Sequence, residues 1–79
     1  MSNIAKMIEV LEIAQVRAAE VNTDQKRINM MSNINRMVPG FGPSPIEYFS
    51  GSCDRTCTPE QFAQFVADKL AFARAHTNG

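Results

Sequence analysis

The pattern of hydrophobic and polar residues is helical over most of the first half of the chain. Apolar residues recur every three or four positions and share one face of a helical wheel at Ile4, Met7, Ile8, Leu11, Ala14, Ala18 and Val21. Ser2 or Asn3 can cap the start of such a helix. The spacing predicts a first helix over residues 3–21.

The apolar stripe then changes side. If the helix runs straight on, the next apolar positions fall nearly opposite to the first stripe: Met31, Ile34 and Val38. A break at 22–24 is the simpler interpretation, because Asn22 and Gln25 have the spacing of a capping box. We therefore predict a second helix over residues 23–37, with one long bent helix as the alternative.

Prolines and capping residues mark the remaining elements. Pro39 must end the second helix, because proline disfavours helical geometry in the residue before it. The segment 44–47 combines a serine cap, a proline at the first helical position and a capping glutamate, which predicts a short helix over residues 45–50. The segment 58–61, Thr-Pro-Glu-Gln, carries the same signals more strongly and predicts a last helix over residues 59–75.

These elements predict an all-α fold. Three main helices form a small helical bundle, and the short helix lies in the Pro/Gly-rich connection before the last of them. The length of 79 residues fits a single helical domain over residues 1–79. We expect the first two helices to be antiparallel and the last to pack across the pair.

The composition indicates more apolar surface than one small domain can cover. A chain of this length buries only about 60–65% of the surface that its unfolded form exposes, yet 44% of its residues are hydrophobic. Domains of this size often depend on oligomerisation. We therefore expect the protein to associate with itself and with a larger protein.

Three β-branched residues on the first helix indicate a second packing surface. Val10, Ile13 and Val16 lie off the main stripe, on the side that also carries Lys6, Glu9, Arg17 and Glu20. The small side chains of Ala14 and Ala18 would let another helix approach closely. Since most soluble oligomers are two-fold homodimers, we predict a homodimer with the first helix at its interface.

The last helix carries a wide apolar face with a lysine in its middle. Phe62, Phe65 and Phe72 lie on this face with Lys69, and these four residues join the candidate interface. We expect Lys69 to lay its stem on the aromatic rings and keep its ammonium in water; pairing with an anion or a carboxylate across an interface is the alternative. His76 extends the same line, but no recognisable catalytic motif includes it.

Cys53 and Cys57 are the candidates for metal or redox chemistry. A tetrahedral zinc site needs four ligands, so this pair could form one only if two subunits shared it. A redox pair is a second possibility, because Cys57 precedes a predicted helix N-terminus, which favours the thiolate. The simplest interpretation is two loop thiols without a cofactor.

The segment Gly40-Phe41-Gly42 lacks the features of a phosphate-binding loop. No strand precedes it, no lysine follows, and Pro43 removes a backbone donor. We expect Phe41 to plug the loop onto the core; an exposed aromatic patch formed with Tyr48 and Phe49 is the alternative.

Charge balance restricts the classes of partner. Eight basic and eight acidic residues give zero formal net charge, which argues against binding driven by phosphates and against electrostatic binding to membranes. No apolar run is long enough to span a membrane, and no targeting segment is recognisable, so we expect a cytoplasmic location.

The sequence therefore predicts a non-catalytic small interaction protein: a homodimeric adaptor, assembly factor or inhibitor of a larger protein complex. No enzyme activity and no cofactor are expected. One alternative is a metal- or redox-responsive regulator that uses Cys53 and Cys57. Another is a small helical nucleic-acid-binding protein that uses Lys26, Arg27 and Arg36.

Overall fold

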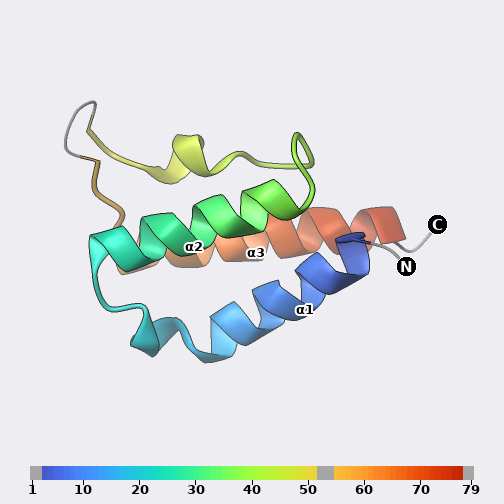
Figure 1. Ribbon diagram of the computed structural model, residues 1–79, viewed down its shortest axis with the longest axis horizontal. Helices are drawn as coiled ribbons and strands as arrows, with labels where there is room; N and C mark the ends of the chain where they lie inside the picture. The colour runs from blue at the N-terminus through green and yellow to red at the C-terminus, as the bar shows by residue number, and fades with distance from the viewer. Residues whose placement is uncertain (1–2, 52–54, 78–79) are drawn as a thin grey trace.

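Helices make up about three-quarters of the described residues of the computed structural model, which describes residues 3–51 and 55–77 (Figure 1). In chain order the elements are α1 (Asn3–Val16), the 3-10 turn η1 (Ala18–Glu20), α2 (Asp24–Met37), the 3-10 turn η2 (Pro45–Tyr48) and α3 (Pro59–Thr77). The described residues form no strand, although an isolated antiparallel bridge joins Ser50 to Thr56. The predicted all-α fold of three main helices and a short one is confirmed.

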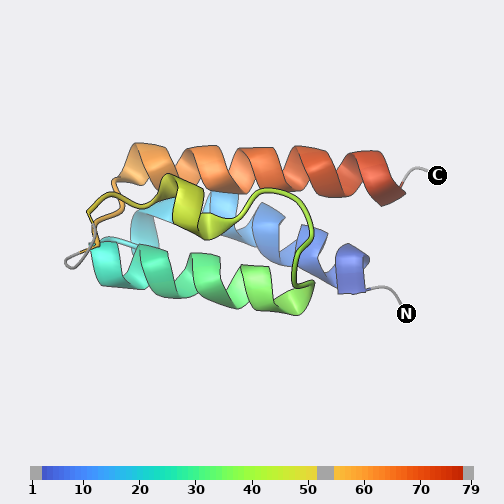
Figure 2. The same cartoon turned by 90° about the horizontal axis from the view of Figure 1, so that it is seen from above.

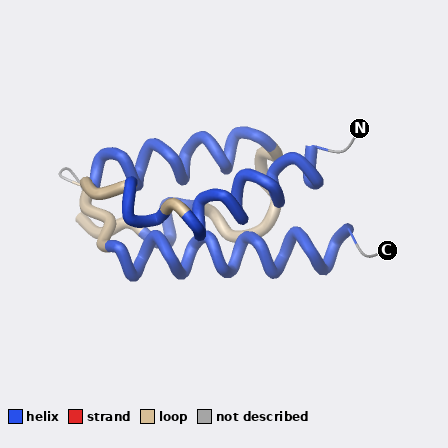
Figure 3. Tube along the Cα trace, turned by 90° about the horizontal axis from the view of Figure 1, so that it is seen from below, coloured by secondary structure: helices blue, strands red, loops and turns tan. Residues whose placement is uncertain are grey.

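The directions of the three α-helices set the architecture. α1 runs antiparallel to α2 and α3, whereas α2 and α3 run in the same direction (Figures 1 and 2). The connection between α2 and α3 therefore returns along the bundle and carries η2 over this pair. From the opposite side, α1 lies over the seam between α2 and α3 (Figure 3). As expected, the last helix packs against both of the others, and it lies alongside them.

The first helix is shorter than the sequence predicts. Instead of extending over residues 3–21, α1 ends at Val16 and the chain tightens into η1. The N–H of Val21 donates to the carbonyl of Ala18 at 3.1 Å, which is the hydrogen bond of a 3-10 turn. α1 and α2 are therefore separate helices and not one bent helix.

Capping side chains set where the later helices begin. Thr23 caps α2, not Asn22: its hydroxyl accepts a hydrogen bond from the N–H of Lys26 at 3.1 Å. At α3 the predicted capping box forms in both directions. The Thr58 hydroxyl accepts from the N–H of Gln61 at 3.1 Å, and the N–H of Thr58 donates to the Gln61 side chain at 2.9 Å.

Two other elements differ in extent from the prediction. The short helix predicted over residues 45–50 is a single 3-10 turn that ends at Tyr48, after which Phe49 is extended (φ −94°, ψ 152°). α3 continues past the predicted residue 75 to Thr77. Its last turn includes a contact of 2.9 Å between His76 Nδ1 and the carbonyl of Phe72.

The core lies where the three α-helices meet. The predicted stripe of α1 supplies Met7, Leu11 and Ala14, all of which are buried. They form one cluster with buried apolar residues from the rest of the chain: Val21, Met31, Ile34, Cys57, Phe62, Phe65, Val66, Leu70 and Ala73. Burying a Leu- or Phe-sized side chain contributes about 1.5–3 kcal/mol, so this cluster is a principal source of stability.

Candidate functional site

The outward side of α1 carries three apolar residues outside the buried core, of which only Val10 packs partly against it. Val10, Ile13 and Val16 follow one another at three-residue spacing, so they lie along one side of the helix, away from the buried Met7 and Leu11. Ile13 is 55% exposed and Val16 is 86% exposed, while Val10 is half-buried. We call these three residues the α1 ridge.

A groove runs between α1 and α2 beside the α1 ridge. Because α1 packs more extensively against α3 than against α2, an opening of about 690 Å³ remains between α1 and α2. Its apolar lining consists of Val10, Ile13, Ala14, Val21, Met30, Ile34 and Met37. A concave apolar surface of this kind can receive side chains or a helix from another molecule.

Charged side chains border the α1 ridge. The α1 ridge lines a shallow depression on the outer side of α1 together with four exposed charged residues: Lys6, Glu9, Glu12 and Arg17. Arg17 Nε lies 3.7 Å from Glu20 Oε2, and both side chains are largely exposed, so water screens this ion pair. The surface therefore has an apolar centre and both signs of charge at its rim.

The phenylalanines of the last helix lie mostly inside the protein. Phe62 and Phe65 are buried and belong to the core. The half-buried Phe72 packs edge-on against Phe41, with ring centroids 4.8 Å apart, and stacks on His76 at 4.1 Å. The prediction of an exposed interface is therefore wrong for Phe62 and Phe65, because other elements of the same protomer cover α3. Phe41 packs against the core, as the plug interpretation expects.

Lys69 is buried as well, and the prediction that its ammonium reaches water is wrong. Its exposed fraction is 0%. Nζ donates to the carbonyls of Phe41 and Pro43, the latter at 2.9 Å, with a longer contact of 3.5 Å to Asn35 Oδ1. Burial lowers the pKa of Lys69 below its usual range. Lys69 therefore ties the returning connection to α3 and is not available to a second molecule.

Tyr48 fastens η2 to α3. Its hydroxyl donates to Asp68 Oδ2 at 2.7 Å, and its ring packs edge-on against Phe65 with centroids 5.5 Å apart. Burial, followed by the hydrogen bond and negative charge of Asp68, raises the pKa of Tyr48 to about 12. This inward anchoring does not fit the alternative of an exposed aromatic patch formed by Phe41, Tyr48 and Phe49.

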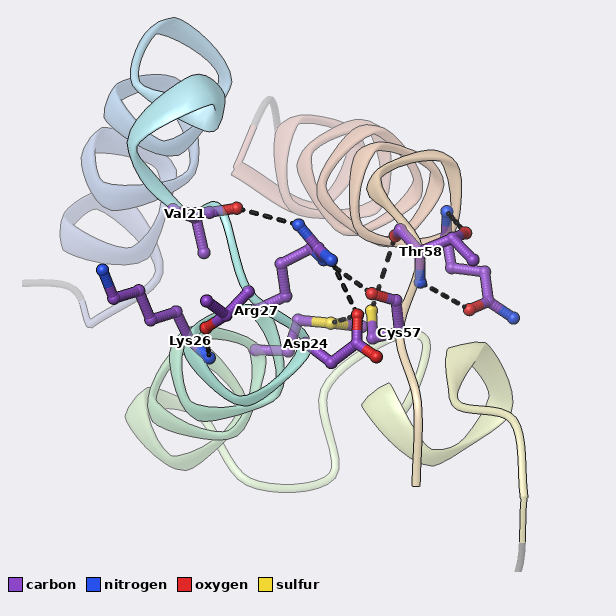
Figure 4. A network of polar contacts seen from close by, with 9 residues as sticks. Val21, Asp24, Lys26, Arg27, Cys57 and Thr58 are labelled. Atoms are coloured by element: carbon purple, nitrogen blue, oxygen red, sulfur yellow. Dashed lines mark hydrogen bonds and ion pairs between the residues drawn. The ribbon is translucent and has the colours of Figure 1, made fainter. Parts of the chain in front are cut away.

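Arg27 joins three parts of the chain near the start of α2 (Figure 4). Nε donates to the carbonyl of Cys57 at 2.6 Å, and Nη1 donates to the carbonyl of Val21 at 3.0 Å. Nη2 forms an ion pair of 2.7 Å with Asp24. The residue is only 8% exposed. Its assignment to a nucleic-acid-binding surface is therefore wrong, because the guanidinium is buried and used inside the fold.

The other two basic residues of that alternative are exposed but lie far apart. Lys26 is in the first turn of α2 and Arg36 in its last turn, a separation of about 15 Å along the helix axis. Lys26 Nζ donates to Asn22 Oδ1 at 3.4 Å. Without Arg27 between them, these two side chains form no continuous basic patch.

Cys57 is a free and buried cysteine. Its Sγ lies 3.4 Å from Met31 Sδ and 3.7 Å from the carbonyl of Thr58. Burial raises the pKa of the Cys57 thiol, and the charge of Arg27 opposes this shift only in part. The thiolate expected beside a helix N-terminus is therefore disfavoured. Cys53, its proposed redox or metal-binding partner, lies outside the described residues.

Helical periodicity does not predict the hydrogen-bond partners of Lys69 and Arg27. A lysine in the middle of an apolar face indicates that α3 needs a polar partner. The sequence does not indicate which one, because the carbonyls that accept from Lys69 lie 26 and 28 positions earlier in the chain. Arg27 carries no such sign, because an arginine in a mostly polar helix is ordinary.

No protein-family model, curated protein or solved structure matches this chain. Across residues 3–51 and 55–77, no group of three or more His, Cys, Asp and Glu side chains is placed to hold a metal ion. No helix in these ranges combines the length and apolar composition needed to cross a membrane. The α1 ridge and the adjoining groove are therefore the candidate functional site.

Proposed function

We propose that this protein is a non-catalytic small interaction protein, acting as a homodimeric adaptor, assembly factor or inhibitor of a larger protein complex. The observation that carries the proposal is the exposure of Ile13 (55%) and Val16 (86%) beside the apolar groove between α1 and α2. We also propose that it works in the cytoplasm and without a cofactor.

The arrangement of the exposed apolar side chains supports binding to another protein. Single apolar residues are common on protein surfaces, but here two exposed residues and the half-buried Val10 share one side of a helix and adjoin a groove lined by Met30 and Met37. Transfer of a medium-sized aliphatic side chain from water into an interface contributes about 1.5–3 kcal/mol. Several such side chains together can offset the entropy lost on association, and methionines adapt to differently shaped partners.

The two alternative functions receive less support. A metal- or redox-responsive regulator needs an accessible thiol, whereas Cys57 is buried. A nucleic-acid-binding protein needs neighbouring basic side chains at the surface, whereas Arg27 is buried and the formal net charge is zero.

A pull-down from the native host with a matched control tests the proposal. The tagged chain is compared with Ile13→Glu, which alters the α1 ridge, and with Ile46→Glu, which alters a residue on η2 that is 60% exposed. We expect the wild type and Ile46→Glu to retain the same proteins in stoichiometric amounts, and Ile13→Glu to lose them, because burying an unpaired carboxylate is costly. Equal retention by all three chains, or by none, would overturn the proposal.

A further inference from the structure

The residues around the α1 ridge are arranged symmetrically about Ile13. Three pairs of positions equidistant from Ile13 hold either two valines or two opposite charges: Val10 and Val16, Glu9 and Arg17, Lys6 and Glu20. At about 100° per residue, the members of this set from Lys6 to Arg17 fall within about 60° of Ile13 around the helix. Glu20 follows in η1. These three pairs are therefore complementary to their own reverse, while Glu12 on the same surface pairs with Arg74 of its own protomer.

We infer that the occupant of the α1 ridge is α1 of a second copy of this chain, running antiparallel, with the two-fold axis beside Ile13. This inference rests on the proposed function and specifies the geometry of the homodimer. In an antiparallel pair, a residue a given number of positions before Ile13 faces the residue the same number of positions after Ile13 in the second copy. Ile13 then faces its own copy, and Val10 faces Val16.

The charges select the antiparallel direction. Glu9 faces Arg17 of the second copy, Lys6 faces Glu20, and the two-fold axis repeats both pairs. In a parallel pair, each of these side chains would instead face its own copy, so like charges would be opposed. Among the described residues, no ion pair within the protomer involves Lys6 or Glu9, so both can pair with a second copy.

The adjoining groove extends the surface that the second copy covers. Val10 and Ile13 line both the outer depression of α1 and the groove between α1 and α2. A helix laid against the α1 ridge therefore also covers part of the groove, toward Met30 and Met37. Since α1 has 14 residues and is about 21 Å long, the contact is small, and we expect a weak dimer in the micromolar range.

Charge reversal and charge swap test this register by sedimentation equilibrium over a range of concentrations. Glu9→Arg and Arg17→Glu each convert two facing pairs from attraction to repulsion, and we expect each to raise the dimer dissociation constant by about tenfold. The double variant restores opposite charges and should restore dimerisation. Glu60→Arg makes the same change of charge at the exposed start of α3 and should leave the dimer intact.

Disulfide trapping tests the same register without altering charge. In a Cys53→Ser background, in which the remaining Cys57 is buried, oxidised Ile13→Cys should cross-link to its own copy. Val10→Cys and Val16→Cys should cross-link efficiently when the two proteins are mixed and poorly when each is alone. Cross-linking of either valine variant to itself at full yield would contradict the antiparallel register.

The outcomes separate this inference from the proposed function. Far-ultraviolet circular dichroism and thermal unfolding verify that each variant folds, including those that lose the Arg17–Glu20 pair. A wild-type chain that stays monomeric at the highest attainable concentration overturns the inference, while the Ile13→Glu pull-down still decides whether the α1 ridge binds another protein. A dimer that tolerates both single reversals, or that the charge swap fails to restore, overturns the antiparallel register.

Discussion

α1 and α3 carry the same kind of surface, but only one of them is covered. Each helix has more apolar residues than one stripe requires, with charged residues among them. On α3, Phe62, Phe65 and Lys69 are buried by the other helices and the returning connection. On α1, Ile13 and Val16 stay exposed. Connectivity explains the difference, because the connection from α2 passes over α3 (Figure 2), whereas no described segment passes over the outer side of α1.

Lys69 on α3 and Lys6 on α1 show how covering a helix changes the surroundings of a charged side chain. Lys69 exchanges water for the backbone carbonyls of Phe41 and Pro43, whereas Lys6 on α1 stays in water. An ammonium can be buried only where oxygen atoms replace its hydration shell. When an apolar face that contains a lysine is covered, the covering segment must therefore supply oxygen atoms for its ammonium. An apolar face that is not covered stays available to a second molecule.

Removing the Lys69 side chain should give the largest effect on stability. Lys69→Ala leaves the carbonyls of Phe41 and Pro43 without a donor and opens a cavity, so we expect the free energy of unfolding to fall by about 3–5 kcal/mol. Lys6→Ala on the exposed side of α1 should change it by less than about 0.5 kcal/mol. Urea denaturation measures both variants. Similar values for the two would mean that burial of Lys69 contributes nothing to holding the connection.

Substituting two glycines in the returning connection should have an intermediate effect on stability, and the two variants can be compared directly. Gly40 and Gly42 have positive φ angles of 74° and 71°, so alanine at either position is strained. A Cβ at Gly42 would lie 2.9 Å from Phe72 Cδ1, whereas at Gly40 it meets nothing within 4 Å. We expect Gly40→Ala to cost about 1 kcal/mol and Gly42→Ala about 2–3 kcal/mol, because the second must also displace a ring. Thermal unfolding that ranks them in the reverse order would contradict the close packing of the connection on α3.

Tyr48 should give the smallest effect, visible mainly as a dependence on pH. Its folded pKa of about 12 lies above the ordinary value of 10.0, so its contribution to stability is present below about pH 10 and is lost as the pH rises through about 12. Tyr48→Phe removes the hydrogen bond to Asp68 and should lower stability at neutral pH by about 1 kcal/mol. Its stability should also decline less steeply than that of the wild type in alkaline solution.

The difference in stability between the wild type and Tyr48→Phe, measured as a function of pH, reports the titration of Tyr48 alone. The raised pKa of Cys57 also reduces stability as the pH rises, whereas the lowered pKa of Lys69 acts in the opposite direction. Both contributions are common to the wild type and Tyr48→Phe. Identical pH profiles of unfolding for the two proteins would contradict the role of the Tyr48–Asp68 hydrogen bond.

The parts of the fold that depend on neighbouring residues could be predicted from the sequence. The stripe that buries Met7, Leu11 and Ala14 is a matter of helical spacing, and the capping box of Thr58 and Gln61 needs only residues three positions apart. The end of α1 is harder, because Val21 continues the apolar spacing although the chain has already left the α-helix. The spacing of apolar residues predicts which side chains point toward the core, but not whether the backbone that carries them is α-helical.

The candidate site could be predicted only where it depends on a single helix. The position of Val10, Ile13 and Val16 outside the core stripe follows from their spacing along α1. The burial of Phe62 and Phe65 depends on which elements pass over α3, and this follows from the parallel direction of α2 and α3. No local signal indicates that direction, so an apolar face that is covered looks the same in the sequence as one that is not.

The packing of α1 also has a consequence for the order in which the molecule assembles. α1 lies mainly against α3, and the Arg74–Glu12 ion pair of 2.9 Å spans 62 positions of the chain. Residues 59–77 are translated after α1, so the nascent chain cannot bury the core stripe of α1 against α3 until they have been made. Closing so long a loop is slow for a helical protein. We therefore expect the core to form only after α3 has been made, and the exposed stripe of α1 to be prone to aggregation until then.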